Sequence, residues 1–318
     1  MTSLVGNAAA QATFDAALRG GALHHAWLIA GPEGVGKATF ARAMAERMLA
    51  EAAGDSGGRT AAMIAAGSHP DYREMKRLPK DTDKPEGEIA RSIPIAQVRA
   101  LQPLFATKPS MSSARIVLID SIDDLERPGA SNALLKNLEE PPAGTIFLLV
   151  SHAPGRLLPT IRSRCRLLRF DPLADADVAG VLRGELPDAS ADEIAALVRA
   201  GAGSPGRALR FAGLDLARID EDLAAIARDG DPANTRRVRL SRALALKSAQ
   251  PRYEAFLERG PAFIAERARA MAGPGLRDAL DAYDSARDLA RVSLAQSLDA
   301  GTTVFEMGGL VARLAKRP

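Results

Sequence analysis

One stretch of the sequence carries residues that could bind the phosphate groups of a nucleotide. It is GPEGVGKATF at residues 31–40, and it contains Gly31, Gly34, Gly36 and Lys37. Glycines at such spacing let backbone amides approach phosphate oxygens, and the lysine ammonium reaches the β- and γ-phosphates. The spacing predicts a P-loop. The alternative is a glycine-rich turn that only packs a helix against a strand.

The residues that usually hold magnesium and activate water are incomplete. Ala38 stands where a P-loop has Ser or Thr, and Thr39 lies about 100° further round a helix, so it does not simply replace the missing hydroxyl. Asp120 ends an apolar run, as the carboxylate that contacts magnesium does. The next residue is Ser121, and a hydroxyl is a poor base near neutral pH. We retain Thr39 and Asp120 as candidate nucleotide contacts but expect no hydrolysis.

Two acids and four histidines lie near these stretches. We interpret Asp123 and Asp124 as a solvated helix start. The histidine pair 24–25 is expected to pack at the edge of the nucleotide pocket, and His69 and His152 are interpreted as structural. None has the spacing of a metal site, so no metal is predicted.

A second candidate site is the sequence RSRCR at residues 162–166. Five arginines fall between residues 156 and 169. They could form a solvated basic face, but an arginine that projects from its domain could also reach phosphates bound by a neighbouring subunit. Cys165 is interpreted as a small buried residue, because no His or Asp partner is visible nearby.

Composition sets wider limits. The chain has 318 residues, which favours two or three domains, and its net charge of +3 is too small to predict nucleic-acid binding by bulk charge. One cysteine suits a reducing compartment and excludes a cysteine zinc site. No run of 18 apolar residues occurs, so we expect a cytoplasmic protein without a membrane span.

The elements that must position these residues change in character along the chain. Strands are predicted at 27–30, 71–75, 115–120, 145–151 and 166–170, with helices at 38–50, 94–104 and 129–140 between them. This alternation predicts an α/β domain with a parallel sheet. Beyond Pro172 only helices are predicted, at 175–183, 190–200, 204–211, 236–248, 261–272, 277–299 and 302–316. We divide the chain into domains at 1–170, 171–213 and 214–318.

Several stretches together resemble the AAA+ clamp-loader family of bacterial DNA polymerase III. They are LHHAWLIAGPEGVGKAT, GSHPDYREM, IAQVRAL, RIVLIDSIDDL, SNALLKNLEEPP, TIFLLVSHAPGRLLPTIRSRC and GSPGRAL, within about residues 15–210. The resemblance implies an AAA+ P-loop domain, a small helical lid domain and a C-terminal all-α collar domain for oligomerisation.

The same resemblance implies roles for individual residues. Arg164 matches the arginine finger of the family's SRC motif, Ser151 the sensor 1 position and Arg207 the sensor 2 arginine. Ala38 and Ser121 match a non-hydrolysing stator subunit better than the hydrolysing gamma/tau subunits. No cofactor is then required, although the site could bind ATP or ADP without hydrolysing it. Zinc is not expected, because the four-cysteine module of the family is missing.

The partners implied by the resemblance are the gamma/tau and delta subunits in a five-subunit ring, which loads a sliding clamp onto primed DNA as part of the DNA polymerase III holoenzyme. The first alternative is an active ATPase subunit of the gamma/tau kind. A lone AAA+ DNA-binding regulator would need a DNA-reading module in the helical third, and none is recognisable there.

Overall fold

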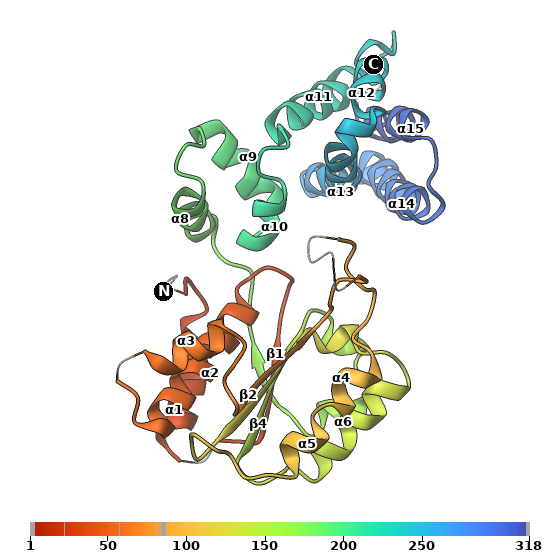
Figure 1. Cartoon of the computed structure of the whole chain (residues 1–318). Coiled ribbons are helices and arrows are strands. Elements are labelled where there is room, and N and C mark those ends of the chain that lie inside the picture. The colour runs from red at the N-terminus through yellow and green to blue at the C-terminus, as the bar shows by residue number, and fades with distance from the viewer. Residues whose placement is uncertain (1–3, 22, 57, 82, 84–86, 316–318) are drawn as a thin grey trace. The chain divides into compact units, whose positions relative to one another are not determined.

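The computed structural model describes residues 4–21, 23–56, 58–81, 83 and 87–315. The chain divides into two compact units, Met1–Asp177 and Val178–Pro318 (Figure 1). The first holds a β-sheet with helices, and the second is helical in its described residues. The predicted subdivision of the helical part near residue 213 stays a prediction.

The first unit alternates strands with helices. Its strands are β1 (Ala26–Ala30), β2 (Tyr72–Lys76), β3 (Arg115–Asp120), β4 (Thr145–Ser151) and β5 (Arg166–Arg169). Its helices are α1 (Ala8–Arg19), α2 (Lys37–Ala53), α3 (Arg59–Ala65), α4 (Ile95–Arg99), α5 (Gln102–Phe105), α6 (Gly129–Glu139) and α7 (Pro159–Arg162), and α8 (Asp175–Glu185) begins here.

The five strands form one parallel sheet in the order β2-β3-β4-β1-β5. The α/β class and the parallel sheet are therefore confirmed. Strands β1, β3 and β4 are buried on both faces, which explains their continuous apolar runs. Since all strands are parallel, the loops after the strands meet at one edge of the sheet and the loops before them at the other. These are called the carboxyl edge and the amino edge below.

Alternate residues of each strand serve two separate cores. Trp27, Ile29 and Leu148 pack with Phe14 of α1 and Phe40 of α2. The intervening strand residues pack with α4 and α6 on the other face, through Leu28, Val117, Phe147, Val98 and Leu134. Figure 1 shows α1–α3 on one side of the sheet and α4–α6 on the other. Each face of the sheet thus buries apolar surface, and each Å² removed from water stabilises the fold by about 25 cal/mol.

The predicted helix at 94–104 is in fact two short helices, α4 and α5, so this prediction was wrong in detail. Pro103 lies in the first turn of α5. A proline has no backbone N–H to continue an existing helix, but its fixed φ suits the first turn of a new one. The chain therefore turns between Arg99 and Gln102.

The second unit consists of helices that pack on one another. They are α9 (Ala191–Gly201), α10 (Pro205–Arg210), α11 (Leu216–Asp229), α12 (Thr235–Leu244), α13 (Gln250–Ala268), α14 (Gly273–Gln296) and α15 (Ala300–Ala312). Sequence reasoning missed α11 and started α13 at Pro261, eleven residues late. Pro261 suited a first turn but lies buried inside the helix, and the true first turn holds Pro251.

A buried ion network joins two of these helices. Arg259 of α13 is 2% exposed, and its guanidinium donates to Asp220 of α11 at 2.6 and 3.1 Å. It also donates to Glu266, seven residues further along α13, at 2.6 and 2.9 Å. Burying a charge is costly unless it is paired and hydrogen-bonded, and here each partner satisfies the guanidinium with two bonds.

Substitution of this arginine is expected to destabilise the helical unit. Arg259→Ala leaves the buried Asp220 carboxylate with only the longer ion pair to Arg199, at 3.7 Å, so the free energy of unfolding should fall by about 3–5 kcal/mol. The matched control is Arg228→Ala, whose pair with Asp229 is exposed; it should change stability by no more than about 0.5 kcal/mol. Urea unfolding followed by far-UV circular dichroism measures both. Equal effects in the two variants would contradict the network's role.

Candidate functional site

The predicted cradle lies at the carboxyl edge, between the end of β1 and the start of α2. Gly31 follows β1, and its N–H donates to the carbonyl of Ser151 at the end of β4, 3.2 Å away. A Cβ at Gly31 would lie 2.0 Å from the carbonyl oxygen of Phe170, so only glycine fits. Gly36 has φ 94° directly before α2. The loop has the strand–turn–helix context of a P-loop.

Lys37 is turned inward onto its own loop. Its side chain is 2% exposed, and the ammonium donates to the carbonyl oxygens of Gly31, at 2.7 Å, and of Pro32. Burial lowers the pKa of Lys37 from 10.5 to about 8, against the opposing charges of Asp120 and Asp123. The loop's own carbonyls thus hold the ammonium that a nucleotide phosphate would otherwise bind.

The magnesium position is poorly supplied with oxygen ligands. Ala38 packs against the core, and Thr39 is exposed. Asp120 ends β3, where one of its oxygens accepts from Arg42 of α2 at 2.9 Å. Of the two side chains that hold magnesium in a P-loop NTPase, one has no oxygen and the other already binds a guanidinium. This donor set does not fit a P-loop magnesium site.

Arg42 and Glu74 belong to this site, although sequence reasoning overlooked both. Arg42 donates to Glu74 of β2 at 2.7 Å as well as to Asp120. The hydrogen bond to Glu74 raises the pKa of Arg42. Burial by itself would raise the pKa of Glu74, but the hydrogen bond and the charge of Arg42 outweigh it, and the net shift is downward. The only signal in the sequence is the position of Arg42 on the helix that follows the cradle.

Asp123 corrects the interpretation of the two acids after β3. Its carboxylate accepts from the Ser151 hydroxyl at 3.1 Å and from the amides of His152 and Ala153 at 2.6 and 3.2 Å. Asp124 accepts from the Ser121 hydroxyl at 3.2 Å and pairs with Arg77. These acids are therefore structural acceptors and not a solvated helix start. Asp123 in particular fixes the predicted sensor 1 residue, Ser151, which is fully buried.

The histidines are distributed differently from the prediction. His24 and His25 precede β1, so they lie at the amino edge, away from the cradle, and the ring of His25 contacts the carbonyl of Leu138 at 3.2 Å. Their placement at the nucleotide pocket was wrong. His69 is buried and its Nδ1 accepts from the amide of Asp71, which agrees with a structural role. Burial first, and the Lys37 charge second, lower the pKa of His152.

Arg164 lies at the amino edge, opposite the cradle. It lies two residues before β5, whereas Lys37 follows β1, the strand that pairs in parallel with β5. With a rise of about 3.3 Å per residue, a four- to five-residue strand separates the two edges by about 13–16 Å. Its side chain is 34% exposed and pairs with Glu139 of α6 at 2.8 Å. Arg164 therefore cannot serve the cradle of its own domain.

The residue after Arg164 is a packing residue. Cys165 packs against the core that contains Ile161, and burial raises the pKa of its thiol to about 12. A thiol with such a pKa stays protonated and does not act as a nucleophile. Cys165 is half-buried rather than buried as predicted, and its raised pKa agrees with the prediction that it is not a nucleophile.

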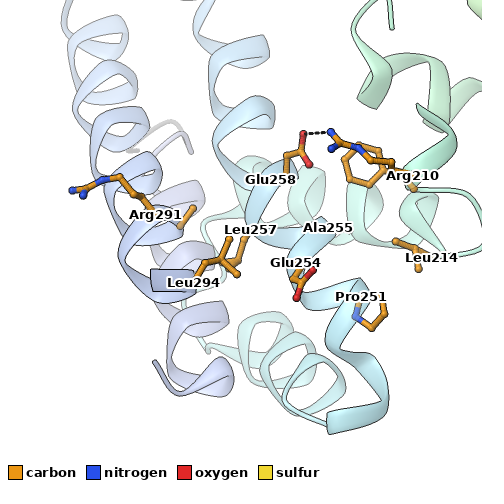
Figure 2. A pocket seen from close by; sticks show the side chains of 11 residues that line it. Arg210, Leu214, Pro251, Glu254, Ala255, Leu257, Glu258, Arg291 and Leu294 are labelled. Atoms are coloured by element: carbon orange, nitrogen blue, oxygen red, sulfur yellow. Dashed lines mark ion pairs between the residues drawn. The ribbon is translucent and has the colours of Figure 1, made fainter. Parts of the chain in front are cut away.

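Arg207 belongs to the second unit, where it has an acidic partner. Its Nε donates to Glu258 of α13 at 2.7 Å, and Arg210 approaches the same carboxylate oxygen at 3.7 Å. Figure 2 shows Glu258 and Arg210 beside a groove of ≈ 630 Å³, which Leu257 and Leu294 also line. Its sensor 2 role stays a prediction, as do the nucleotide contacts of Gly31, Gly34, Gly36, Lys37, Thr39, Asp120 and Ser151.

The described residues also set limits on metal and membrane sites. Within residues 4–315 and outside the gaps given above, no group of three His, Cys, Asp or Glu side chains could hold a metal ion. None of the helices described there has both the length and the apolar character to cross a membrane.

Comparison with known proteins shows the family of the chain. The family described as "DNA polymerase III, delta subunit" matches residues 6–174, and the chain belongs to this family of clamp-loader subunits. The DNA polymerase III subunit delta' of Pseudomonas aeruginosa is 38% identical over 203 residues, 62% of this chain and 58% of the relative. That of Escherichia coli is 34% identical over 200 residues, 61% and 56% of the two chains.

These matches cover only part of each protein. The chain spans less than three fifths of the length of these two curated relatives. Gamma and tau subunits match as well, at 32% and 36% identity over shorter stretches. Among solved structures, the RuvB branch migration motor of Thermotoga maritima aligns with 96% of this chain and 87% of its own, at 16% identity and a TM-score of 0.46. That score is too low to support an argument.

The buried ammonium of Lys37 leads to a pH prediction. Its pKa is about 8 in the folded chain and 10.5 unfolded, so between these values the unfolded chain binds more protons. The free energy of unfolding should therefore rise with pH across this window, by on the order of 2 kcal/mol. Lys37→Met lacks this contribution. Urea unfolding of the wild type and of Lys37→Met at about pH 7.5 and pH 10 measures the contribution. If the two proteins differed in unfolding free energy by the same amount at both pH values, the assignment would be contradicted.

Proposed function

We propose that this chain is a non-hydrolysing stator subunit of a bacterial clamp loader, and that Arg164 acts as an arginine finger on ATP bound by a neighbouring subunit. The observation that carries the proposal is the placement of Arg164 and Lys37 at opposite edges of one sheet. An arginine that cannot reach its own cradle can meet a nucleotide phosphate only on another molecule. Family membership supplies the setting, a replication complex of related subunits.

The cradle itself supports the non-hydrolysing part of the proposal. Ala38 offers no magnesium ligand, and Ser121 donates its hydroxyl hydrogen bond to Asp124. Positioning and charge stabilisation supply most of the rate in phosphoryl transfer, so their loss slows hydrolysis by orders of magnitude. The residues of the cradle that remain have internal partners, since Lys37 is held by loop carbonyls and Asp120 by Arg42.

The proposed partners follow from the family. They are gamma/tau and delta subunits in a five-subunit ring, held together by the C-terminal helices, which loads a sliding clamp onto primed DNA in the cytoplasm. Nucleotide is not required in this chain's own site. The second candidate function is an active ATPase subunit, which the matches to gamma and tau subunits favour.

Substitution of the finger tests the proposal. Arg164→Ala in the reconstituted complex should lower the DNA-stimulated ATPase by about tenfold or more, because the neighbour's nucleotide loses a cation that stabilises its transition state. Arg169→Ala, at an exposed arginine of the edge strand β5, is the matched control and should leave the rate within about twofold. Full ATPase activity in the Arg164→Ala complex would exclude the finger role.

The isolated chain separates the two candidate functions. We expect no phosphate release above background from the purified chain with ATP and magnesium, because the ligand set at Ala38 and Asp120 does not fit the metal. Equilibrium binding of labelled ATP should be weak or undetectable and should not depend on magnesium. Turnover by the isolated chain, abolished by Lys37→Met, would support the gamma/tau-like function instead.

A further inference from the structure

The contact between Glu139 and Arg164 joins two segments that the proposed function treats separately. Glu139 is the last residue of α6, and its carboxylate forms an ion pair with Nη2 of Arg164, at an N–O distance of 2.8 Å. On the other side of the guanidinium, Nη1 donates to the carbonyl oxygen of Thr160 in α7, at 2.9 Å. One ion pair and one hydrogen bond, from two different helices, therefore set the direction of the guanidinium.

An acidic residue at this place is unfavourable for the helix that carries it. The carboxyl end of a helix bears partial negative charge, so a carboxylate there is repelled and a cation is attracted. α6 nevertheless ends in Glu139 and is followed by Glu140. Glu139 has a cationic partner in Arg164, whereas Glu140 has no side-chain partner among the described residues. The ion pair with Arg164 therefore explains why an acidic residue stands at the carboxyl end of α6, where the helix dipole disfavours it.

The backbone of Arg164 is anchored on both sides. Ile161 is 2% exposed, and Cys165 packs into the same core. The amide of Arg164 donates to the carbonyl oxygen of Ile161 at 3.2 Å. With the main chain fixed in this way, the remaining freedom is in the long side chain, which the ion pair with Glu139 and the hydrogen bond to Thr160 restrict.

The arrangement leaves part of the guanidinium available. Arginine has five N–H donors in a planar fork. Nε has no partner among the residues that the structure describes, and Nη2 has only the ion pair with Glu139, since both hydrogen bonds of this side chain come from Nη1. Phosphate oxygens match such a pair of donors. The contact with Glu139 therefore orients the fork without using all of it.

We infer that Glu139 is a positioning residue for Arg164, which holds the guanidinium in its working direction before a neighbour's nucleotide is engaged. This inference rests on the proposed finger role of Arg164. A side chain ordered in advance loses less freedom on engagement, so the gain falls on the rate of the chemical step and not on nucleotide affinity.

The test is a double-mutant cycle on kcat in the reconstituted clamp-loader complex. Glu139→Ala should lower the kcat of the DNA-stimulated ATPase by about fivefold, with the KM for ATP within about twofold of the wild type. Glu139→Asp keeps the negative charge that pairs with the guanidinium and should recover part of the rate. Glu140→Ala is the matched control and should have no effect. Gel filtration confirms that each variant assembles.

The combined variant distinguishes positioning from a general structural role. If Glu139 acts through Arg164, Glu139→Ala in an Arg164→Ala background should change kcat by less than about twofold. A further fivefold loss in that background would show that Glu139 acts independently, and would overturn the inference. An unchanged rate in Glu139→Ala alone would overturn it as well, while the finger role stood. If Arg164→Ala alone had no effect, the proposed function would fail and the inference with it.

Discussion

The carboxylate of Asp123 is the interaction on which the carboxyl edge of the sheet depends. It lies after β3 and accepts three hydrogen bonds from residues 151–153, at the end of β4. The carbonyl of Ser151 accepts in turn from the amide of Gly31, the first residue of the cradle. The ends of three adjacent strands are thus connected through a single short acid. Hydrogen bonds to a charged acceptor are stronger than neutral ones, which suits a junction between separate strands.

Charge balance explains why a cradle persists without the parts for hydrolysis. The buried ammonium of Lys37 is held by loop carbonyls, and Arg42 bridges Asp120 and Glu74. Lys37 is buried, so its ammonium needs these partners, whereas Arg42 is partly exposed and solvent weakens its two ion pairs. These groups therefore stabilise the domain whether or not a nucleotide is present. The residues that stabilise the cradle are therefore different from the residue proposed to act on ATP, since Arg164 lies at the opposite edge of the sheet.

Much of this could be predicted from the sequence because burial leaves a strong pattern. The apolar runs of β3 and β4 predicted a doubly covered parallel sheet, and the glycine spacing predicted the loop after β1. What the sequence could not supply were contacts between distant segments. Arg42 meets Asp120 across 78 positions, and Arg164 meets Glu139 only because α6 and β5 approach the same edge. Prolines misled where tertiary packing overrode their local preference, as at Pro261 inside α13.

The burial of Cys165 has a consequence for the chemistry around the arginine. Peroxides, disulfides and alkylating reagents react with thiolates, and a thiol whose pKa is raised to about 12 is almost entirely protonated in a cell. Cys165 is also the single cysteine of the sequence. The raised pKa therefore disfavours oxidation of the thiol beside Arg164, and the sequence holds no other thiol.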